Sequence, residues 1–503
     1  RYTLPSIEES SAETERLISA AQTGGTIELN NDVRLMKTVT IPSGTTLTIT
    51  TSEGASLIML ANKNIGGPMF KVENDAHLIL DGDISYQCQW LDDNVFAEVK
   101  GTLTLKKGEI SRVETKSTDK GAIKVSGGTF NMDGGIITRC TFGNQYSGSV
   151  LLDGDGATML MSAGEITGND AEVDNATPGV LVKENSTFTM TGGTISNGNG
   201  SRGAGVLVGL PGTSYNEQTP AKFEMKGGMI SNNVANPTTS TVNAGGGGVF
   251  VQDNAEFTMT DGTITGNRTK GNGMGGGVAT ANPLQDNGGR FTMSGGTISN
   301  NSASCGGGVY SYSGDNAVQL LSGKIINNKA AINGGGVYVS THPYSITLQN
   351  ALITGNSASI MGGGIWSCPT GTILLSSESA VYDNTAKDAG DDLALVPKWN
   401  GVEATTTFSQ QTLGGGYTTW YKDGAVVLAY SADQYGSTNP EAPRFDAANP
   451  GSPVAAEMNA TRGFALKASL TNEAKAWARS GDRLIIEGNS AQRGGGIGTN
   501  GKI

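Results

Sequence analysis

Residues 188–198 read FTMTGGTISNG and residues 291–301 read FTMSGGTISNN, and this repeated phrase decides the fold. Phe188 and Met190 fall on one face of the first element and Thr189 and Thr191 on the other, which is the period of a half-buried strand. A Gly-Gly corner, a Thr-Ile pair and an asparagine corner follow. A second signature, GGGVYV at residues 334–339, closes the unit. Each unit therefore holds three short strands separated by corners.

Copies of this unit fill the middle of the chain at spacings of 27 to 35 residues. They begin at Leu103, Phe130, Met159, Phe188, Phe223, Phe257, Phe291, Val318, Ile346 and Ile373. Three strands in about 27 residues do not suit hairpins, but they suit a coil stacked on its successors at about 4.8 Å per rung. The repeat predicts an all-β parallel β-helix, a solenoid of three sheets with about a dozen rungs, in which stacked asparagines pair their amides from coil to coil.

The regions outside the repeat predict caps for this solenoid. Residues 1–50 are assigned to an N-terminal cap, with a short amphipathic helix at 11–22, and to the first coils. Residues 51–396 carry the repeats and residues 397–483 form a C-terminal excursion that caps the end. The phrase returns at residues 484–503, which predicts a final coil.

Composition limits the partners of the chain. The 503 residues carry 75 glycines, only 16% charged residues and a net charge of −12. Scattered arginines in an acidic chain argue against nucleic acid. The longest apolar run is too short to cross a bilayer, so no membrane insertion is expected. The expected form is an extracellular monomer.

The phrases GGTISNN and GGGVYV resemble the right-handed parallel β-helix repeats of Gram-positive, wall-anchored surface adhesins, over roughly residues 100–395 and 484–501. More loosely they resemble the repeats of chlamydial polymorphic outer-membrane proteins. The resemblance implies a right-handed helix and a location on a bacterial cell surface, attached to the cell wall in the full-length protein.

The residue X of each Gly-Gly-Gly-Val-X-Val should face outward, because the valines face the core. Read down the rungs, X is Lys124, Leu151, Leu181, Leu207, Phe250, Ala279, Tyr310, Tyr338 and Trp366. Such an apolar stripe is either covered by the 397–480 excursion or the inserted loops, or forms a platform for sugar rings or a protein. Phe250, Tyr310, Tyr338 and Trp366, with Tyr215 and His342 from neighbouring loops, are the candidate ligand-binding residues.

A glycosidase would need two carboxylates in reach of one bond. The densest acidic cluster is Asp383, Asp388, Asp391 and Asp392, and Asp153, Asp155, Asp170, Glu172 and Asp174 form a second group. Asp391 and Asp392 also replace the corner glycines of the repeat, which is the structural explanation for them. No cofactor or metal is predicted; calcium at an acidic group stays an open alternative without EF-hand spacing.

Cys88 and Cys140 lie about two rungs apart, and so do Cys305 and Cys368, so neither pair is expected to form a disulfide. The favoured function is an adhesin or binding module that contacts host glycan or glycoprotein through a face of the β-helix. A glycoside hydrolase or polysaccharide lyase is the alternative, and a structural spacer the third. β-Helices host all of these, so the fold alone does not choose.

Overall fold

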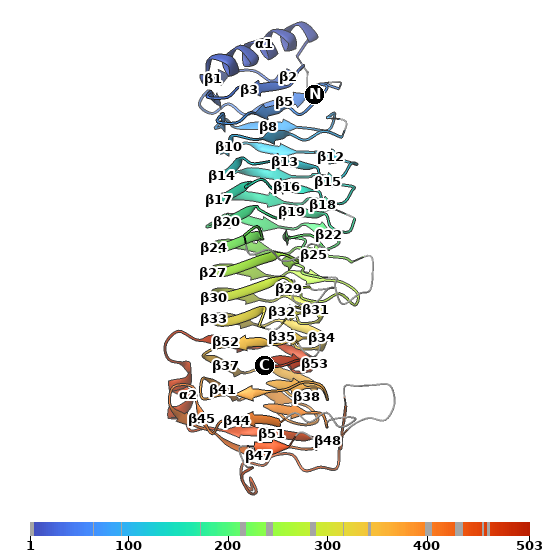
Figure 1. The fold of residues 1–503 in the computed structure, drawn as a ribbon, viewed down its shortest axis with the longest axis vertical. Coiled ribbons are helices and arrows are strands. Elements are labelled where there is room, and N and C mark those ends of the chain that lie inside the picture. The colour runs from blue at the N-terminus through green and yellow to red at the C-terminus, as the bar shows by residue number, and fades with distance from the viewer. Residues whose placement is uncertain are drawn as a thin grey trace. The chain divides into compact units, whose positions relative to one another are not determined.

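The computed structural model describes residues 5–63, 65–91, 93–171, 173–211, 218–237, 245–281, 288–314, 316–340, 344–397, 405–427, 436–454, 457–459 and 463–503. Strands dominate these residues, with two helices, α1 (Ile7–Thr23) and α2 (Asn472–Arg479). The strands stack in parallel, coil upon coil, so the predicted parallel β-helix is confirmed (Figure 1). No helix in the described ranges is long and apolar enough to cross a bilayer.

The chain divides into two compact units, which we call the N-terminal unit (residues 1–238 and 248–257) and the C-terminal unit (residues 239–247 and 258–503). From residue 102 onward each coil adds strands to three sheets, whereas the coils before it add strands to the first and third sheets only. The first sheet contains the FTM and Thr-Ile segments, the second the short segment after the asparagine corner, and the third the GGGVXV segment.

The first sheet of the N-terminal unit is built from the following strands: β1 (Gly25–Leu29), β2 (Val33–Leu35), β4 (Thr46–Thr51), β5 (Leu57–Ala61), β7 (His77–Leu80), β8 (Ile84–Gln87), β10 (Thr102–Leu105), β11 (Glu109–Ser111), β14 (Thr129–Thr138), β17 (Thr158–Thr167), β20 (Thr187–Met190), β21 (Thr194–Ser196) and β24 (Ala221–Ser231). Its second sheet contains β12 (Glu114–Thr115), β15 (Thr141–Phe142), β18 (Asp170–Ala171), β22 (Asn199–Gly200) and β25 (Val234–Ala235). Its third sheet contains β3 (Val39–Ile41), β6 (Phe70–Val72), β9 (Ala97–Val99), β13 (Gly121–Val125), β16 (Gly148–Leu152), β19 (Thr177–Val182), β23 (Val206–Val208) and β26 (Val249–Val251). Strand β27 (Ala255–Thr265) has residues in both units.

The C-terminal unit repeats this arrangement. Its first sheet contains β30 (Arg290–Ser299), β33 (Val318–Ile326), β36 (Ile346–Leu348), β37 (Ala351–Thr354), β41 (Ser379–Tyr382) and β52 (Leu484–Glu487). Its second sheet contains β28 (Arg268–Thr269), β31 (Ser302–Cys305), β34 (Lys329–Asn333), β38 (Ser357–Met361), β42 (Thr385–Ala386) and β53 (Ser490–Arg493). Its third sheet contains β29 (Val278–Thr280), β32 (Val309–Ser311), β35 (Val337–Val339), β39 (Ile365–Ser367), β43 (Leu393–Leu395) and β54 (Ile497–Thr499), followed by β47 (Thr419–Lys422) and β51 (Phe464–Ser469).

Like residues stack on like residues inside the coils. In the N-terminal unit the rings of Phe188, Phe223 and Phe257 lie face to face, with centroids 4.8 and 4.7 Å apart. In the C-terminal unit the amides of the corner asparagines form a continuous hydrogen-bonded ladder, as the sequence indicates. Asn267 donates to Asn301 at 3.0 Å, and Asn301 donates to Asn328 at 3.0 Å.

The three-glycine corner requires glycine for two separate reasons. Gly306 has φ 64°, in the left-handed region that disfavours a side chain. Gly308 has an ordinary backbone, but a Cβ atom there would meet the Gly336 carbonyl oxygen at 2.6 Å and the Asn328 amide at 3.0 Å. The corner therefore packs directly against the asparagine ladder of the neighbouring coil.

The last coil in the sequence, residues 484–499, does not lie at the end of the stack. Strand β52 pairs with β33 on one side and β37 on the other, β53 lies between β34 and β38, and β54 lies between β35 and β39. Residues 484–499 are thus inserted between two coils that are consecutive in sequence. The chain returns through the excursion to fill this place, and Asn489 joins the ladder between Asn328 and Asn356, at 3.0 and 2.8 Å.

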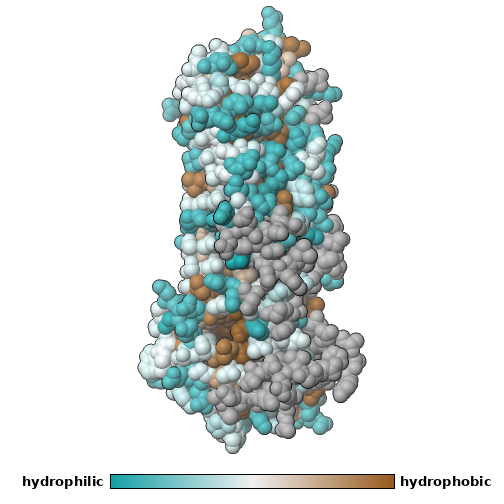
Figure 2. All heavy atoms as spheres, viewed as in Figure 1, coloured by the Kyte–Doolittle hydropathy of each residue, from teal (hydrophilic) through white to brown (hydrophobic). Residues whose placement is uncertain are grey.

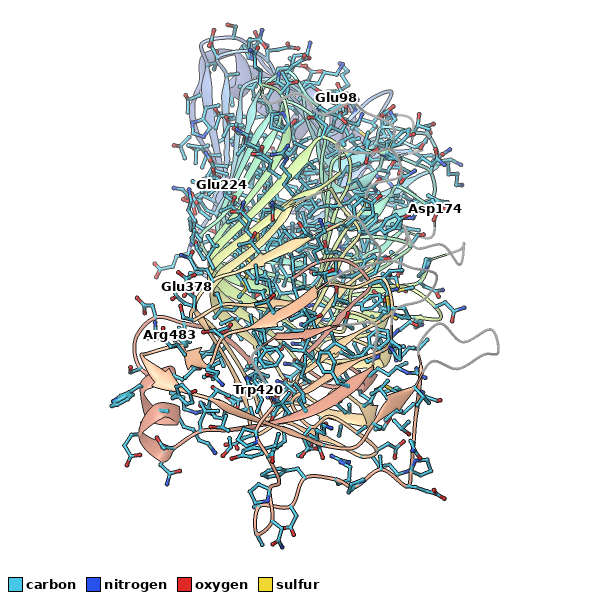
Figure 3. The ribbon with its side chains drawn as sticks, turned by 60° about the horizontal axis from the view of Figure 1, so that its bottom comes forward. Glu98, Asp174, Glu224, Glu378, Trp420 and Arg483 are labelled. Atoms are coloured by element: carbon cyan, nitrogen blue, oxygen red, sulfur yellow. The ribbon has the colours of Figure 1, made fainter. Side chains whose placement is uncertain are left out.

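Both ends of the stack are covered. Helix α1 begins with a capping box between Ser6 and Glu9 and buries Leu17 and Ala21 against the first coils. At the other end β51 and β47 add antiparallel strands beyond β43. Trp420 of β47, labelled in Figure 3, is buried and meets the Phe408 ring edge-on at 5.2 Å. Three further strands, β40 (Leu374–Leu375), β44 (Thr405–Phe408) and β50 (Glu457–Asn459), form a small sheet in this region. It also holds two short hairpins, β45 (Gln411–Thr412) with β46 (Gly416–Tyr417) and β48 (Val426–Val427) with β49 (Ser437–Thr438).

Candidate functional site

The row of X residues on the third sheet changes character along the chain. In the N-terminal unit it begins with polar side chains, and Lys71 pairs with Glu98 (labelled in Figure 3) at 3.8 Å while Lys124 pairs with Asp153 at 2.8 Å. Leu151 and the X residues after it are buried. The sequence-predicted residues Phe250, Tyr310, Tyr338 and Trp366 are 1%, 1%, 5% and 0% exposed, so their ring faces do not form an open platform.

Neighbouring aromatic residues account for part of this burial. The Tyr310 ring lies 6.4 Å from Tyr312 and 6.1 Å from Tyr338, and Tyr312 packs edge-on against Tyr344 at 5.3 Å. The Tyr310 hydroxyl donates to Ser340 at 3.0 Å, and burial raises the pKa of Tyr310. Figure 2 shows hydrophobic side chains gathered in one patch in the lower half of the view. Tyr215 and His342, the two predicted loop contacts, lie outside the described residues.

Three of the four residues of the predicted acidic cluster, Asp383, Asp391 and Asp392, form ion pairs with the excursion, and the fourth, Asp388, is half-buried without one among the described residues. Arg444 reaches Asp391 at 2.6 Å and Asp423 at 2.5 Å, and Lys467 reaches Asp391 at 3.2 Å and Asp392 at 3.5 Å. Asp383 instead pairs with Lys475 at 2.8 Å on the surface. The excursion is thereby tied to the last coil of the repeat.

Asp392 ends the asparagine ladder. One carboxylate oxygen accepts the backbone and side-chain N–H groups of Asn384 at 3.0 and 2.9 Å. In each earlier rung of the ladder, the side-chain oxygen of the next asparagine accepts the same two groups. The other oxygen accepts from Ala468 N–H at 2.8 Å. Burial raises the pKa of Asp392. Burial alone would lower the pKa of Lys467, but the carboxylates of Asp392 and Asp391 outweigh it and raise that pKa. The arrangement closes the ladder with a satisfied carboxylate.

Two members of the second acidic group, Asp153 and Asp174, are also paired, and Glu172 lies outside the described residues. Asp153 accepts from Lys124 and, at 2.5 Å, from Lys183. Asp174, labelled in Figure 3, accepts from Ser201 and lies 3.7 Å from Arg202. No group of three His, Cys, Asp or Glu side chains gathers as a metal-ligand set in the part of the chain that the structure describes. The cysteines are buried and unbridged, and burial raises the pKa of Cys140 to about 12.

A polar groove of about 780 Å³ crosses the first sheet of the N-terminal unit. Its lining includes Glu53, Asp81, Asp83 and Glu109 together with Lys106 and Lys107. Asp81 lies 3.4 Å from Lys106, and Ser56 donates to Asp83 at 2.5 Å. His77 borders this region, bonded to Thr104 at 2.9 Å, and burial followed by the charge of Lys106 lowers its pKa. Sequence reasoning missed this groove because its residues come from the corner of four successive coils.

A second feature that sequence reasoning missed is the outer face of the second sheet in the C-terminal unit, which we call the flat face. Five of its strands bury one alanine each, Ala303, Ala330, Ala491, Ala358 and Ala386, and β28 buries Thr269 instead; the residue before each of these faces outward. One outward row is Arg268, Ser302, Lys329, Ser490, Ser357 and Thr385, in register from strand to strand. The row beside it exposes Lys270, Ala331, Gln492, Ser359 and Lys387, and the residue at this place in β31, Ser304, is buried. The repeated pattern S-A-S could have indicated this surface.

A shallow groove of about 440 Å³ crosses the flat face over three neighbouring strands. It is lined by Lys329, Ala330, Ala331, Ser357, Ala358, Ser359, Ser490, Ala491 and Gln492. The inserted coil supplies the middle strand, so the groove exists only because residues 484–499 return to this position. No family model, curated protein or solved structure matches the chain.

Proposed function

We propose that the chain is a binding module of an extracellular bacterial surface protein, an adhesin, and that it holds an extended glycan of the host on the flat face of the C-terminal unit. The observation that carries this proposal is the in-register row Arg268, Ser302, Lys329, Ser490, Ser357 and Thr385, whose hydroxyl and cationic side chains lie at one-strand spacing. Such a surface offers a hydrogen-bonding group about every 4.8 Å along the stack.

The chemistry of the flat face suits a polysaccharide. Serine and threonine hydroxyls both donate and accept, and Gln492 adds an amide, so the face can match the hydroxyl groups of successive sugars. The buried alanines keep the sheet close to the core and the side chains short. An extended chain lying along the groove would therefore contact several coils at once.

Glycan-array binding tests this function with a matched pair of variants. Ala331→Trp places a large side chain on the exposed floor of the groove, and Trp is well tolerated on strands. The control Thr141→Trp changes an exposed residue of the second sheet in the N-terminal unit. We expect Ala331→Trp to abolish binding and Thr141→Trp to preserve it. Equal binding by both variants would remove the flat face as the site.

The groove of the N-terminal unit favours a second candidate, a carbohydrate-active enzyme. It combines four carboxylates with two lysines beside open space. Incubation with mucin-type and plant polysaccharides would release reducing ends if this candidate is right, and Asp81→Asn and Glu109→Gln would lower the rate. No release from any polysaccharide would leave binding as the better proposal.

A further inference from the structure

We infer that the flat face selects acidic polysaccharides, with carboxylate or sulfate groups, over neutral ones. This inference rests on the proposed function, since it assigns the ligand class of the same surface. It starts from the charges of the two rows. Arg268, Lys270, Lys329 and Lys387 are exposed on the face, and neither row contains an aspartate or a glutamate.

These four cations differ from four cations that tie the excursion and the last coils together. Arg444, Lys467, Lys475 and Arg479 each form an ion pair at 3.5 Å or less. By contrast, Arg268, Lys270, Lys329 and Lys387 form no ion pair with a described carboxylate. In a chain of net charge −12, a face with four positive charges and no carboxylate is a local reversal of sign. Their charge is available to a ligand.

The spacing of the cations fits a linear polymer. Arg268 and Lys329 are two strands apart in one row, which is about 10 Å. Lys329 and Thr385 are three strands apart, which is about 14 Å. Lys387 lies two residues after Thr385 and faces outward like it. Ser490, Ser357 and Thr385 fill the interval with hydroxyl groups. An anionic group every few sugars would meet a cation while the sugar hydroxyls between meet serine and threonine.

Nucleic acid fits this face less well than an acidic glycan. Binding of single strands uses aromatic side chains on which bases stack, and neither row contains one. Duplex binding relies on denser phosphate contacts than cations separated by several hydroxyl residues provide. The hydroxyl-rich interval instead matches a polymer that carries many hydroxyls for each charge.

The test uses two pairs of polymers that differ only in charge: dextran sulfate with dextran, and polygalacturonate with its methyl ester. The affinity of the full chain for each is measured by calorimetry at two salt concentrations. We expect at least one acidic polymer to bind and its neutral counterpart to bind far more weakly, with affinity falling as salt screens the charges. The sulfate and carboxylate arms show which anion the face takes.

The variant Lys329→Gln/Lys387→Gln removes two charges from the face, and Lys324→Gln/Lys422→Gln removes two exposed charges elsewhere in the unit. We expect about a thirtyfold loss of affinity for the acidic polymer in the first variant, from about 1 kcal/mol for each of the two lysines, and little change in the control. Any one of four results would overturn the inference. These are equal binding of acidic and neutral polymers, an equal loss of affinity in both variants, no binding of any polymer, or displacement of the bound acidic polymer by an equal amount of DNA. If a neutral glycan binds the lysine variant but does not bind Ala331→Trp, the proposed function stands and only the charge selectivity is removed.

Discussion

The two units are built from the same kind of coil but differ at the corner between the first and second sheets. In the C-terminal unit every corner holds a buried asparagine, Asn267, Asn301, Asn328, Asn489, Asn356 and Asn384 in spatial order. Each of the five after Asn267 accepts two N–H groups from the asparagine of the rung before. In the N-terminal unit the corresponding positions are Val113, Cys140, Asn169, Gly198 and Asn233. There Asn169 has no asparagine beside it in the preceding rung, and its side chain accepts from Cys140 N–H at 2.8 Å and donates to the Ile137 carbonyl at 3.1 Å.

The same fold therefore accommodates a continuous ladder of buried amides in one unit and an interrupted ladder in the other. In the broken form, apolar stacking such as Phe188 on Phe223 supports the coils. In the continuous form, each hydrogen bond polarises the next, and loss of one member leaves its neighbours unsatisfied. The C-terminal unit should therefore be more sensitive to a single corner substitution than the N-terminal unit.

The largest expected effect is that of Asn489→Ala, which cuts the ladder at the inserted coil. The change leaves the backbone and side-chain N–H groups of Asn328 and the carbonyl of Ile325 without partners. We expect the free energy of unfolding of the C-terminal unit to fall by about 4 kcal/mol. Urea unfolding, with hydrogen exchange to locate the change, measures it.

The matched control is Asn169→Ala in the N-terminal unit, which removes an asparagine that contacts only the backbone of Cys140 and Ile137. A loss of about 2 kcal/mol is expected there. If both variants lose the same free energy, the continuous ladder adds nothing to its separate hydrogen bonds.

The two caps provide the next comparison, because helix α1 is held by apolar burial and the C-terminal excursion by buried ion pairs. Arg444→Met would leave the Asp423 carboxylate, 1% exposed, without its guanidinium partner, and should destabilise the excursion by about 3 kcal/mol. Arg16→Met on α1 breaks an exposed pair with Glu13 and should cost less than about 1 kcal/mol. Hydrogen exchange across residues 464–469 and 7–23 reports the two caps separately.

The same ion pair gives the excursion a dependence on pH. Burial of Asp423 acts to raise its pKa, but hydrogen bonds from Arg444 and from the N–H groups of Asp391 and Phe445 hold the pKa below its ordinary value of 3.8. The folded state therefore binds this proton less well than the unfolded chain, so the stabilisation is present above pH 3.8 and is lost as the pH falls through the lowered pKa. Asp423→Asn should flatten the acid limb of stability against pH. An unchanged acid limb would show that other carboxylates control it.

A smaller effect is expected at the end of the ladder. Asp392→Asn keeps an oxygen for Asn384 but turns an amide N–H toward the donors Ala468 N–H and Lys467, and should cost about 2 kcal/mol. Asp383→Asn, in an exposed pair of the same coil, should cost less than about 1 kcal/mol. Denaturant midpoints compare the two, and equal midpoints would mean that Asp392 does not cap the ladder.

Asp392 also explains which part of the fold could be predicted. The repeat predicted the strands, the corners and the asparagine pairing because each depends on local periodicity. The place of residues 484–499 could not be predicted, since the phrase fits against any other copy of itself. The structural reason is that Asp392 stands where Gly364 stands one coil earlier, and its side chain occupies the site of a following asparagine. No further coil can stack there, so the last copy is inserted elsewhere.

The candidate sites show the same limit. Alternation along a strand predicts that Tyr310 and Trp366 face away from the valines, but it does not predict what packs over them. The acidic cluster could not be recognised as ion-paired because its partner Arg444 is 53 residues from Asp391 in the chain. The flat face was missed because its rows combine a coil from residues 490–493 with coils from residues 268–387.

The smallest effect concerns the corner residue that precedes the ladder position. In the C-terminal unit this residue is asparagine, glycine or aspartate, as at Asn300, φ 54°, and Asn327, φ 56°. In the N-terminal unit Arg112 occupies the left-handed region with φ 61° and is exposed without a described ion-pair partner. Arginine is strained there and glycine is not, so Arg112→Gly should stabilise the N-terminal unit by about 0.5 to 1 kcal/mol, the strain relieved exceeding the entropy that glycine loses on folding. Asn327→Ala should destabilise the C-terminal unit by a similar amount, because alanine lacks the local hydrogen bonding that lets asparagine adopt this backbone. Thermal unfolding of both variants measures the pair, and destabilisation by Arg112→Gly would mean that the Arg112 side chain makes a stabilising contact that outweighs its backbone strain.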